Sequence, residues 1–192
     1  PQPAQIPPRD FLFVLDVSGS MHGFPLDTAK LLIGELGRRL RPEDRFNVLL
    51  FASDSRVLSP TSLPATPENL AAASALLDQE QGGGGTELVA AMRRALALPA
   101  TEGAARIVSV VTDGYVDMEP ELFELVRANL GRASLFTFGI GSSVNRHLIE
   151  GLARAGHGEP FVVTEPDLAE HAAAAFREMI EASGGSPAIF DV

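Results

Sequence analysis

The chain contains no cysteine, so neither a disulfide framework nor a thiolate metal site can form, and zinc in its usual structural form is excluded. It has no apolar stretch of about 18 residues or more, the length that spans a membrane, and no basic-then-apolar leader. We therefore expect neither a membrane span nor an export signal in this segment. Basic residues are also scarce, with 15 Lys and Arg against 25 Asp and Glu and a formal charge of −10. This charge repels phosphate backbones, so nucleic acid is not an expected partner, whereas cations and basic protein patches are favoured.

The length and composition predict one domain. At 192 residues and 45% hydrophobic content, the chain can bury a substantial core. Residues 1–8 are rich in proline and are predicted to form a linker. We expect the domain at 9–183, followed at 184–192 by a linker and the start of a truncated segment. These ends predict a module cut from a longer protein.

Strand and helix signals alternate along the sequence, which predicts a mostly parallel sheet with helices on both faces. The expected strands are 11–16, 46–51, 56–58, 107–112, 135–140 and 161–163. The expected helices are 24–40, 66–78, 87–98, 120–129, 145–155 and 166–181. The fold class is therefore α/β, a doubly wound, Rossmann-like sheet of six strands, in which only the edge strand 56–58 runs antiparallel.

Oxygen-bearing side chains gather where two of these strands end. Asp16-Val17-Ser18-Gly19-Ser20 follows an apolar run and places one carboxylate and two hydroxyls on a tight turn. A run of four glycines at 82–85 leads into Thr86, and a second apolar run closes on Asp113. Ligands of doubly wound sheets bind outside the carboxyl ends of the strands, where the strand order reverses. Asp16 and Asp113 are expected to flank that reversal and to face one crevice.

Each of these residues also has an ordinary explanation. Thr86 stands where a helix N-cap is expected, Ser18 and Ser20 are common turn residues, and Asp113 with the following glycine is a common turn pair. Their convergence at one edge of the sheet favours a site for a hard cation. Mg²⁺ commonly takes one or two carboxylates and fills its other positions with neutral oxygens and water, whereas Ca²⁺ usually recruits more carboxylates. The set therefore favours Mg²⁺, with Mn²⁺ and Ca²⁺ as alternatives.

The pattern resembles the von Willebrand factor type A (VWA) domain, whose metal-ion-dependent adhesion site has the form Asp-x-Ser-x-Ser with a later Thr and a later Asp. All five positions match, and the resemblance covers about residues 9–183. Within that superfamily, the stretches 13–21, 44–47 and 66–70 are similar to the inter-alpha-trypsin inhibitor heavy chains and their bacterial relatives. One departure is that Asp191 is followed by Val192, so the glycosaminoglycan linkage of those heavy chains is not carried over.

The resemblance implies a metal site of Asp16, Ser18, Ser20, Thr86 and Asp113 that presents its cation to an Asp or Glu of a protein partner. It implies recognition and adhesion, with no enzymatic turnover. It also implies a β-rich VIT domain before this segment and a place in the bacterial cell envelope, outside the cytoplasm. Tyr115 and Asp117 are candidates for contact with a partner on the rim of the crevice.

Two other function classes stay open. The domain is structural if its metal only ties three loops together and leaves no position for an external carboxylate. A magnesium-dependent hydrolase or phosphotransferase would use Asp16 as a nucleophile. Against the second class, Ser18 occupies the position of the acid or base of such phosphatases, and no lysine follows Lys30.

Overall fold

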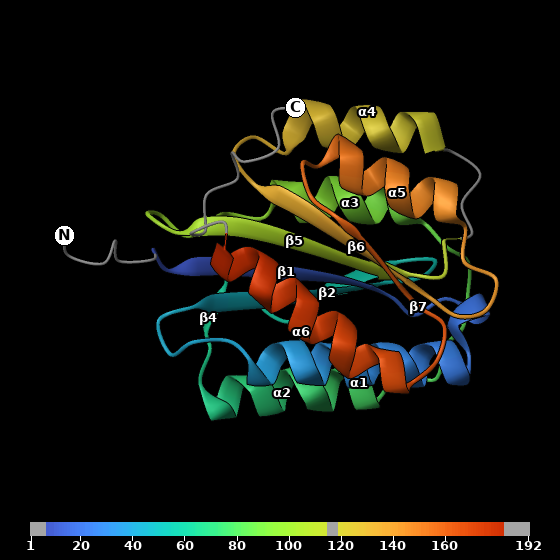
Figure 1. The fold of residues 1–192 in the computed structure, drawn as a ribbon, viewed down its shortest axis with the longest axis horizontal. Helices are drawn as coiled ribbons and strands as arrows, with labels where there is room; N and C mark the ends of the chain where they lie inside the picture. The colour runs from blue at the N-terminus through green and yellow to red at the C-terminus, as the bar shows by residue number, and fades with distance from the viewer. Residues whose placement is uncertain (1–6, 115–118, 183–192) are drawn as a thin grey trace.

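The computed structural model describes residues 7–114 and 119–182 as one alternating α/β arrangement (Figure 1). Its strands are β1 (Arg9–Asp16), β2 (Arg45–Phe51), β3 (Ser55–Val57), β4 (Leu63–Pro64), β5 (Ala105–Thr112), β6 (Ser134–Ile140) and β7 (Pro160–Val163). Its helices are α1 (Phe24–Arg38), α2 (Pro67–Asp78), α3 (Leu88–Ala97), α4 (Glu119–Asn129), α5 (Arg146–Ala155) and α6 (Asp167–Ala182), with a 3₁₀ turn at Gly19–Met21. Tyr115, Asp117, most of the expected linker at 1–8 and the expected segment at 184–192 lie outside the described residues.

The sheet confirms the predicted fold class. Its strand order is β3-β2-β1-β5-β6-β7. The neighbouring pairs β2–β1, β1–β5, β5–β6 and β6–β7 are all parallel. β3 is antiparallel to β2, as expected, but the two-residue strand β4 also pairs antiparallel with β2. The sequence predicts six strands, one of them antiparallel, and therefore misses the short antiparallel strand β4. A strand of two residues that ends in Pro64 carries neither alternation nor a β-branched run, so it leaves no signal in the sequence.

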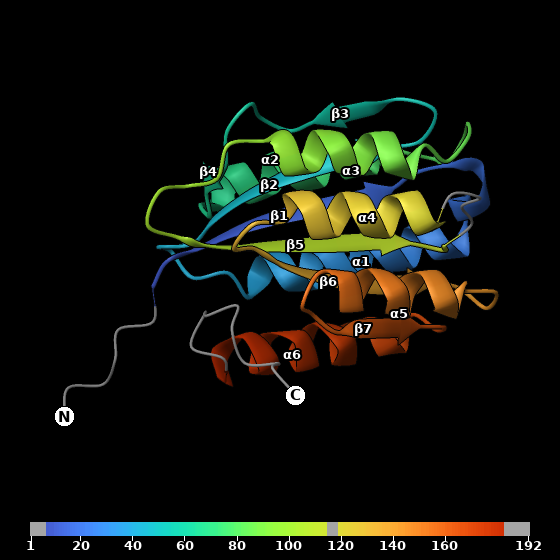
Figure 2. The same cartoon turned by 90° about the horizontal axis from the view of Figure 1, so that it is seen from above.

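Two hydrophobic cores lie on the two faces of the sheet. Alternate residues of β1 point to opposite faces, so Phe11, Phe13 and Leu15 join one core while Leu12 and Val14 join the other. Helices α1, α2 and α6 cover the first face, and α3, α4 and α5 cover the second (Figures 1 and 2). The central strands are therefore buried on both sides, which explains their almost continuous apolar sequences.

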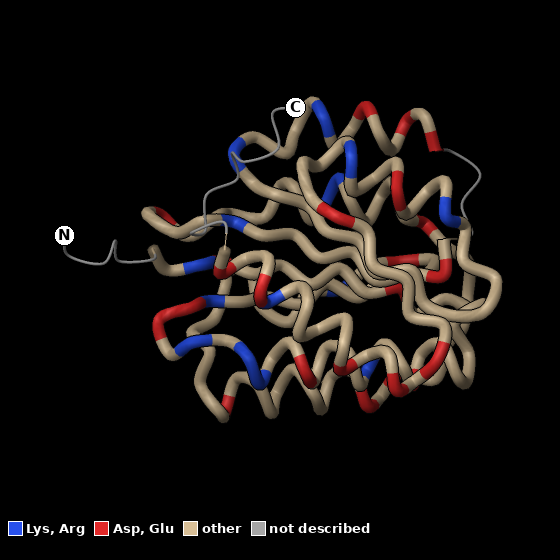
Figure 3. The backbone as a smooth tube through the Cα atoms, in the orientation of Figure 1, with Lys and Arg blue, Asp and Glu red and all other residues tan. Residues whose placement is uncertain are grey.

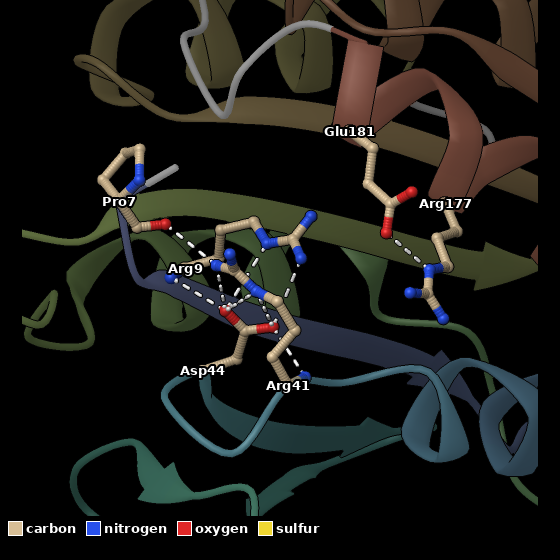
Figure 4. A network of polar contacts seen from close by, with 6 residues as sticks. All are labelled: Pro7, Arg9, Arg41, Asp44, Arg177 and Glu181. Atoms are coloured by element: carbon tan, nitrogen blue, oxygen red, sulfur yellow. Dashed lines mark hydrogen bonds and ion pairs between the residues drawn. The ribbon is translucent and has the colours of Figure 1, made fainter. Parts of the chain in front are cut away.

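A buried ion cluster anchors the start of β1 to the loop before β2 (Figure 4). Asp44 is fully buried, and its carboxylate accepts hydrogen bonds from the backbone N–H groups of Arg9 (3.1 Å) and Arg41 (2.9 Å). The Arg41 guanidinium donates to Asp44 Oδ1 at 2.8 Å and to the Pro7 carbonyl at 2.9 Å. Burial by itself raises the pKa of Asp44, but the hydrogen bonds from Arg41 and the charge of Arg9 outweigh it, so that this pKa is lowered.

Charged side chains otherwise lie mainly at the surface. Figure 3 shows acidic residues on helices of both faces of the sheet. Among the described residues, no helix is long and apolar enough to cross a bilayer.

Candidate metal centre

The predicted site lies at the ends of β1 and β5, where the strand order reverses. β1 pairs with β2 on one side and with β5 on the other, and Asp16 is its last residue. Leu15 is in register with Val111, so Thr112 and Asp113 follow at the level of the Asp16 turn. The chain therefore brings the ends of β1 and β5 together at the switch point, as the sequence predicts.

Asp16 is the buried carboxylate of this edge. Its exposed fraction is 0%, its Oδ1 accepts from the Ser18 backbone N–H at 2.8 Å, and its Oδ2 accepts from the Thr112 hydroxyl at 2.7 Å. Burial raises the pKa of Asp16, the charge of Asp113 raises it further, and the hydrogen bonds only partly offset these effects. Within residues 7–114 and 119–182, Asp16 forms no ion pair. A carboxylate in this state gains from a nearby cation.

The two serines of the turn lie side by side. Ser18 is fully buried and Ser20 is exposed, and their hydroxyl oxygens are 3.2 Å apart. The Ser18 side chain also hydrogen-bonds the Asp16 carboxylate and lowers its pKa, and the 3₁₀ turn Gly19–Met21 carries Ser20 to the surface. This turn forms a continuous line of oxygens from the buried carboxylate to the surface.

The glycine run lies directly against this turn. Gly83 N–H donates to the Val17 carbonyl at 3.0 Å, and Gly19 N–H donates to the Gly84 carbonyl at 3.0 Å. Gly84 has a φ of 80°, which residues with side chains rarely adopt, and a Cβ there would lie 2.8 Å from the Ser53 hydroxyl. The backbone conformation and this close contact therefore both disfavour a side chain at position 84. The backbone of the glycine run therefore packs closely against the Asp16 turn.

Thr86 follows the run and is half-buried. Its ordinary explanation as an N-cap is wrong, because α3 begins at Leu88 and Glu87 occupies the cap position without a side-chain cap bond. By contrast, the Thr66 hydroxyl does cap α2 by accepting from the Asn69 N–H at 3.3 Å. Thr86 therefore has no capping role that competes with metal ligation.

Asp113 is half-buried at the end of β5. Its carbonyl accepts from the Asn145 N–H at 3.2 Å, which ties the end of β5 to the start of α5. Its charge contributes to the raised pKa of Asp16, which places the two carboxylates within electrostatic reach of each other. Among the described residues, no three His, Asp or Glu side chains group as a metal site, so the candidate set consists of two carboxylates and three hydroxyls.

Thr112 is a member of the site that the sequence analysis missed. It is fully buried, and besides donating to Asp16 its hydroxyl accepts from the Gly114 N–H at 3.1 Å. It therefore fixes the Asp16 carboxylate and the turn after Asp113 at the same time. The only sequence signal was a hydroxyl residue at the end of a β-branched strand, which is common in strands without any functional role.

The donor set fits a hard divalent cation. It offers two carboxylates and three hydroxyls, which are the ligand types that Mg²⁺ binds, and its buried carboxylate, that of Asp16, has no basic partner within the described part of the chain. A cation would compensate that charge. The fold and the chemistry together define a doubly wound α/β domain with an oxygen-lined site at its switch point.

Comparison with known proteins identifies the family. The model of the von Willebrand factor type A domain matches residues 9–160, and the chain belongs to this family. A VWA domain-containing protein of Dictyostelium discoideum is 32% identical over 163 residues, which are 84% of this chain and 18% of that protein. Inter-alpha-trypsin inhibitor heavy chain H3 of Bos taurus is 28% identical over 171 residues, 82% of this chain and 19% of that protein. The chain thus spans about a fifth of the length of these relatives.

Solved structures share the fold. An aerotolerance-related membrane protein of Bacteroides fragilis superposes with a TM-score of 0.72 at 19% identity, covering 91% of this chain and 99% of that one. Proximal thread matrix protein 1 from the mussel byssus, described with a zinc-occupied MIDAS (metal-ion-dependent adhesion site) motif, superposes with a TM-score of 0.70 at 17% identity. This alignment covers 91% of this chain and 46% of the mussel protein. VWA domains typically mediate protein interaction and adhesion, and they commonly bind a metal at this site.

Proposed function

We propose that this chain is a divalent-cation-dependent protein-binding module. Asp16, Ser18, Ser20, Thr86 and Asp113 hold the ion, which is Mg²⁺ in preference to Mn²⁺ or Ca²⁺, and present it to an Asp or Glu of a partner. The observation that carries this proposal is the buried Asp16 carboxylate, whose pKa is raised and which leads through Ser18 to the exposed hydroxyl of Ser20.

The composition of the ligand set supports recognition of an external anion. The bound ion supplies positive charge at the surface, and two carboxylates with neutral hydroxyls leave it well placed to attract one more anionic oxygen. Asp16 lies behind the serines in the protein interior, and Ser20 is exposed at the mouth. A partner carboxylate would therefore approach from the side of Ser20.

Calorimetry with Mg²⁺ and Mn²⁺ tests the metal site. We expect wild type to bind one ion and Asp113→Ala to lose most of that affinity, because Asp113 is one of only two carboxylates in the set. Glu102→Ala is a matched control, because Glu102 is an exposed acid in the loop before β5 and outside the set. Equal affinity of wild type and Asp113→Ala for Mg²⁺ and Mn²⁺ would contradict the proposal.

A structural role is the second candidate, because the site joins the β1 turn, the glycine run and the end of β5. In that case metal raises the melting temperature, but no external carboxylate binds to it. Titration of the Mn²⁺-loaded protein with acetate, followed by water-proton relaxation, separates the two roles. Displacement of metal-bound water by acetate supports presentation, and an unchanged relaxation rate supports the structural role.

The proposal extends to the full-length protein. A VIT domain would precede this segment, as in the relatives of the inhibitor heavy chains, and the protein would act in a bacterial envelope outside the cytoplasm. The similarity to the heavy chain and to a structure named as a membrane protein supports this setting. Fractionation of cells that express the full-length protein tests it, and recovery only in the cytoplasm would contradict it.

A further inference from the structure

Lys30 is the only lysine of the chain, and its position is unusual. It lies in the middle of α1, it is half-buried, and its ammonium donates to the backbone carbonyl of Glu80 at 2.8 Å. Asp27 and Asp78 line the same groove as Lys30, yet among the described residues neither forms an ion pair with it. The ammonium is therefore directed at a backbone carbonyl just beyond the end of α2.

Glu80 begins the segment that carries Thr86. From Glu80 onward, this segment is bonded to the chain that follows β1. The contacts are Lys30 Nζ to Glu80 O (2.8 Å), His22 Nδ1 with Gln81 O (2.7 Å), Gly83 N to Val17 O (3.0 Å) and Gly19 N to Gly84 O (3.0 Å). They form a ladder between the Asp16 turn with α1 on one side and the glycine run on the other. Lys30 makes the first contact of the ladder along the segment that leads to Thr86.

Such a ladder is needed because of the composition of the run. Glycine loses more conformational freedom on folding than any other residue, so four in a row form a loop that is intrinsically poorly fixed. Thr86 lies directly after this loop and has no cap bond of its own. On either side of it, the Gly85 N–H donates to the Ser53 hydroxyl at 2.7 Å and the Glu87 N–H donates to the Ala52 carbonyl at 2.9 Å. The position of Thr86 therefore depends on these two bonds together with the contacts that hold the segment from Glu80 to Gly84.

We propose that Lys30 is a positioning residue of the metal site: by holding the Glu80 carbonyl, it fixes the glycine run and thereby places the Thr86 hydroxyl at the ion. This inference rests on the proposed metal-binding function. Lys30 touches neither the ion nor the partner. Its effect reaches the ion through Thr86, which distinguishes it from a residue that only stabilises α2.

The surroundings of Lys30 make it a suitable position for substitution. Its side chain lines an open groove of about 620 Å³ between α1 and α2, beside Gly34, whose added Cβ would meet no atom within 4 Å. Methionine at position 30 keeps the aliphatic stem and removes the ammonium, and it leaves no closed cavity. Arg38→Met is a matched control, because Arg38 lies in the same helix and lines the same groove.

The experiment measures Mn²⁺ affinity by calorimetry for wild type, Lys30→Met, Lys30→Arg, Arg38→Met, Thr86→Ala and the double variant Lys30→Met/Thr86→Ala. Substituting a residue that holds a metal ligand in place typically weakens metal binding by about 10–100-fold. We expect Lys30→Met to lose about tenfold in affinity, and Lys30→Arg and Arg38→Met to stay within about threefold of wild type. In the Thr86→Ala background, Lys30→Met should cause little further loss, because residues that act through one another are not additive.

The outcomes separate this inference from the proposed function. If wild type binds Mn²⁺ and Lys30→Met binds equally well, Lys30 has no positioning role, although the metal site stands. Full additivity of Lys30→Met and Thr86→Ala also overturns the inference, because it shows that Lys30 does not act through Thr86. Absence of Mn²⁺ binding by wild type overturns both proposals.

Discussion

Replacing Asp16 by asparagine tests the central physical claim about the metal site. The claim is that this carboxylate is costly in the metal-free protein and useful only with a cation. Asparagine has nearly the same shape, and its side-chain oxygen can still accept from the Ser18 N–H. Its amide can donate to the Thr112 hydroxyl, which rotates to accept. The substitution therefore removes the buried charge and keeps both side-chain contacts, while the Thr112 hydroxyl proton loses its Asp16 acceptor.

The two states of the protein should respond with different signs. Because the pKa of Asp16 is raised in the folded protein, its ionisation lowers stability as the pH rises from the unfolded value, about 3.9, through the folded value. At pH 7 without metal, we expect Asp16→Asn to leave the free energy of unfolding unchanged or to raise it by about 1 kcal/mol. With metal at 100 times its Kd, wild type gains about 2.7 kcal/mol. For a domain of this size, that gain corresponds to a rise in Tm of roughly 5–10 °C, which the variant should lack.

Urea unfolding with EDTA measures the first effect, and thermal unfolding with and without Mg²⁺ measures the second. Ser109→Ala is a useful control, because Ser109 is a buried polar residue in the middle of β5, away from the strand ends. A loss of more than about 1 kcal/mol in metal-free Asp16→Asn would refute the reasoning, since it would show that the carboxylate stabilises the fold by itself. A Tm rise with Mg²⁺ equal to that of wild type would refute the assignment of Asp16 to the site.

Three further changes test the surrounding structure. Asp44→Asn should cost about 3 kcal/mol of unfolding free energy at pH 7, because it leaves buried Arg9 without its partner. Since the pKa of Asp44 is lowered in the folded protein, this contribution is complete above a pH of about 4. The difference from wild type in urea unfolding should therefore shrink as the pH falls toward 2. Phe176→Ala should lower the free energy of unfolding by about 3–5 kcal/mol in the same assay, because its ring packs in the core with its centroid 5.0 Å from that of Phe136. A loss below about 1 kcal/mol would contradict this packing. Gly84→Ala should weaken Mn²⁺ binding in calorimetry and Gly83→Ala much less, because of these two glycines Gly84 alone combines a positive φ with a close neighbour. Equal effects would show that the turn does not require glycine at position 84.

Features that repeat locally along the chain could be predicted from the sequence. The apolar run before Asp16 and the run before Asp113 predict buried parallel strands, and the structure places them side by side as β1 and β5. The alternation of strands and helices predicts the doubly wound order, and that order locates the crevice. The positions of Asp16 and Asp113 follow from these features, whereas the binding of a metal by the five candidate residues stays a prediction.

Contacts between distant segments could not be predicted. The hydrogen bond from Thr112 to Asp16 joins residues 96 positions apart, and neither residue type indicates its partner. The bond between Lys30 and Glu80 spans 50 positions, and it depends on where α2 ends, which is a boundary that sequence patterns give only approximately. The N-cap prediction for Thr86 failed for a related reason, because the loop that precedes α3 is held by other segments and the helix starts at Leu88, one residue later than predicted.

Two aspartates of this chain show how the same buried group can serve stability or binding. Asp44 and Asp16 are both fully buried, yet the pKa of Asp44 is lowered and that of Asp16 is raised. Asp44 has its counter-charges within the chain, in Arg9 and Arg41, so its ionised form stabilises the fold. Asp16 has hydrogen bonds but no basic partner among the described residues, and a second carboxylate lies close by. A buried acid that the fold leaves uncompensated gains most from a charge that comes from outside, and this asymmetry is the physical basis for placing the cation at Asp16.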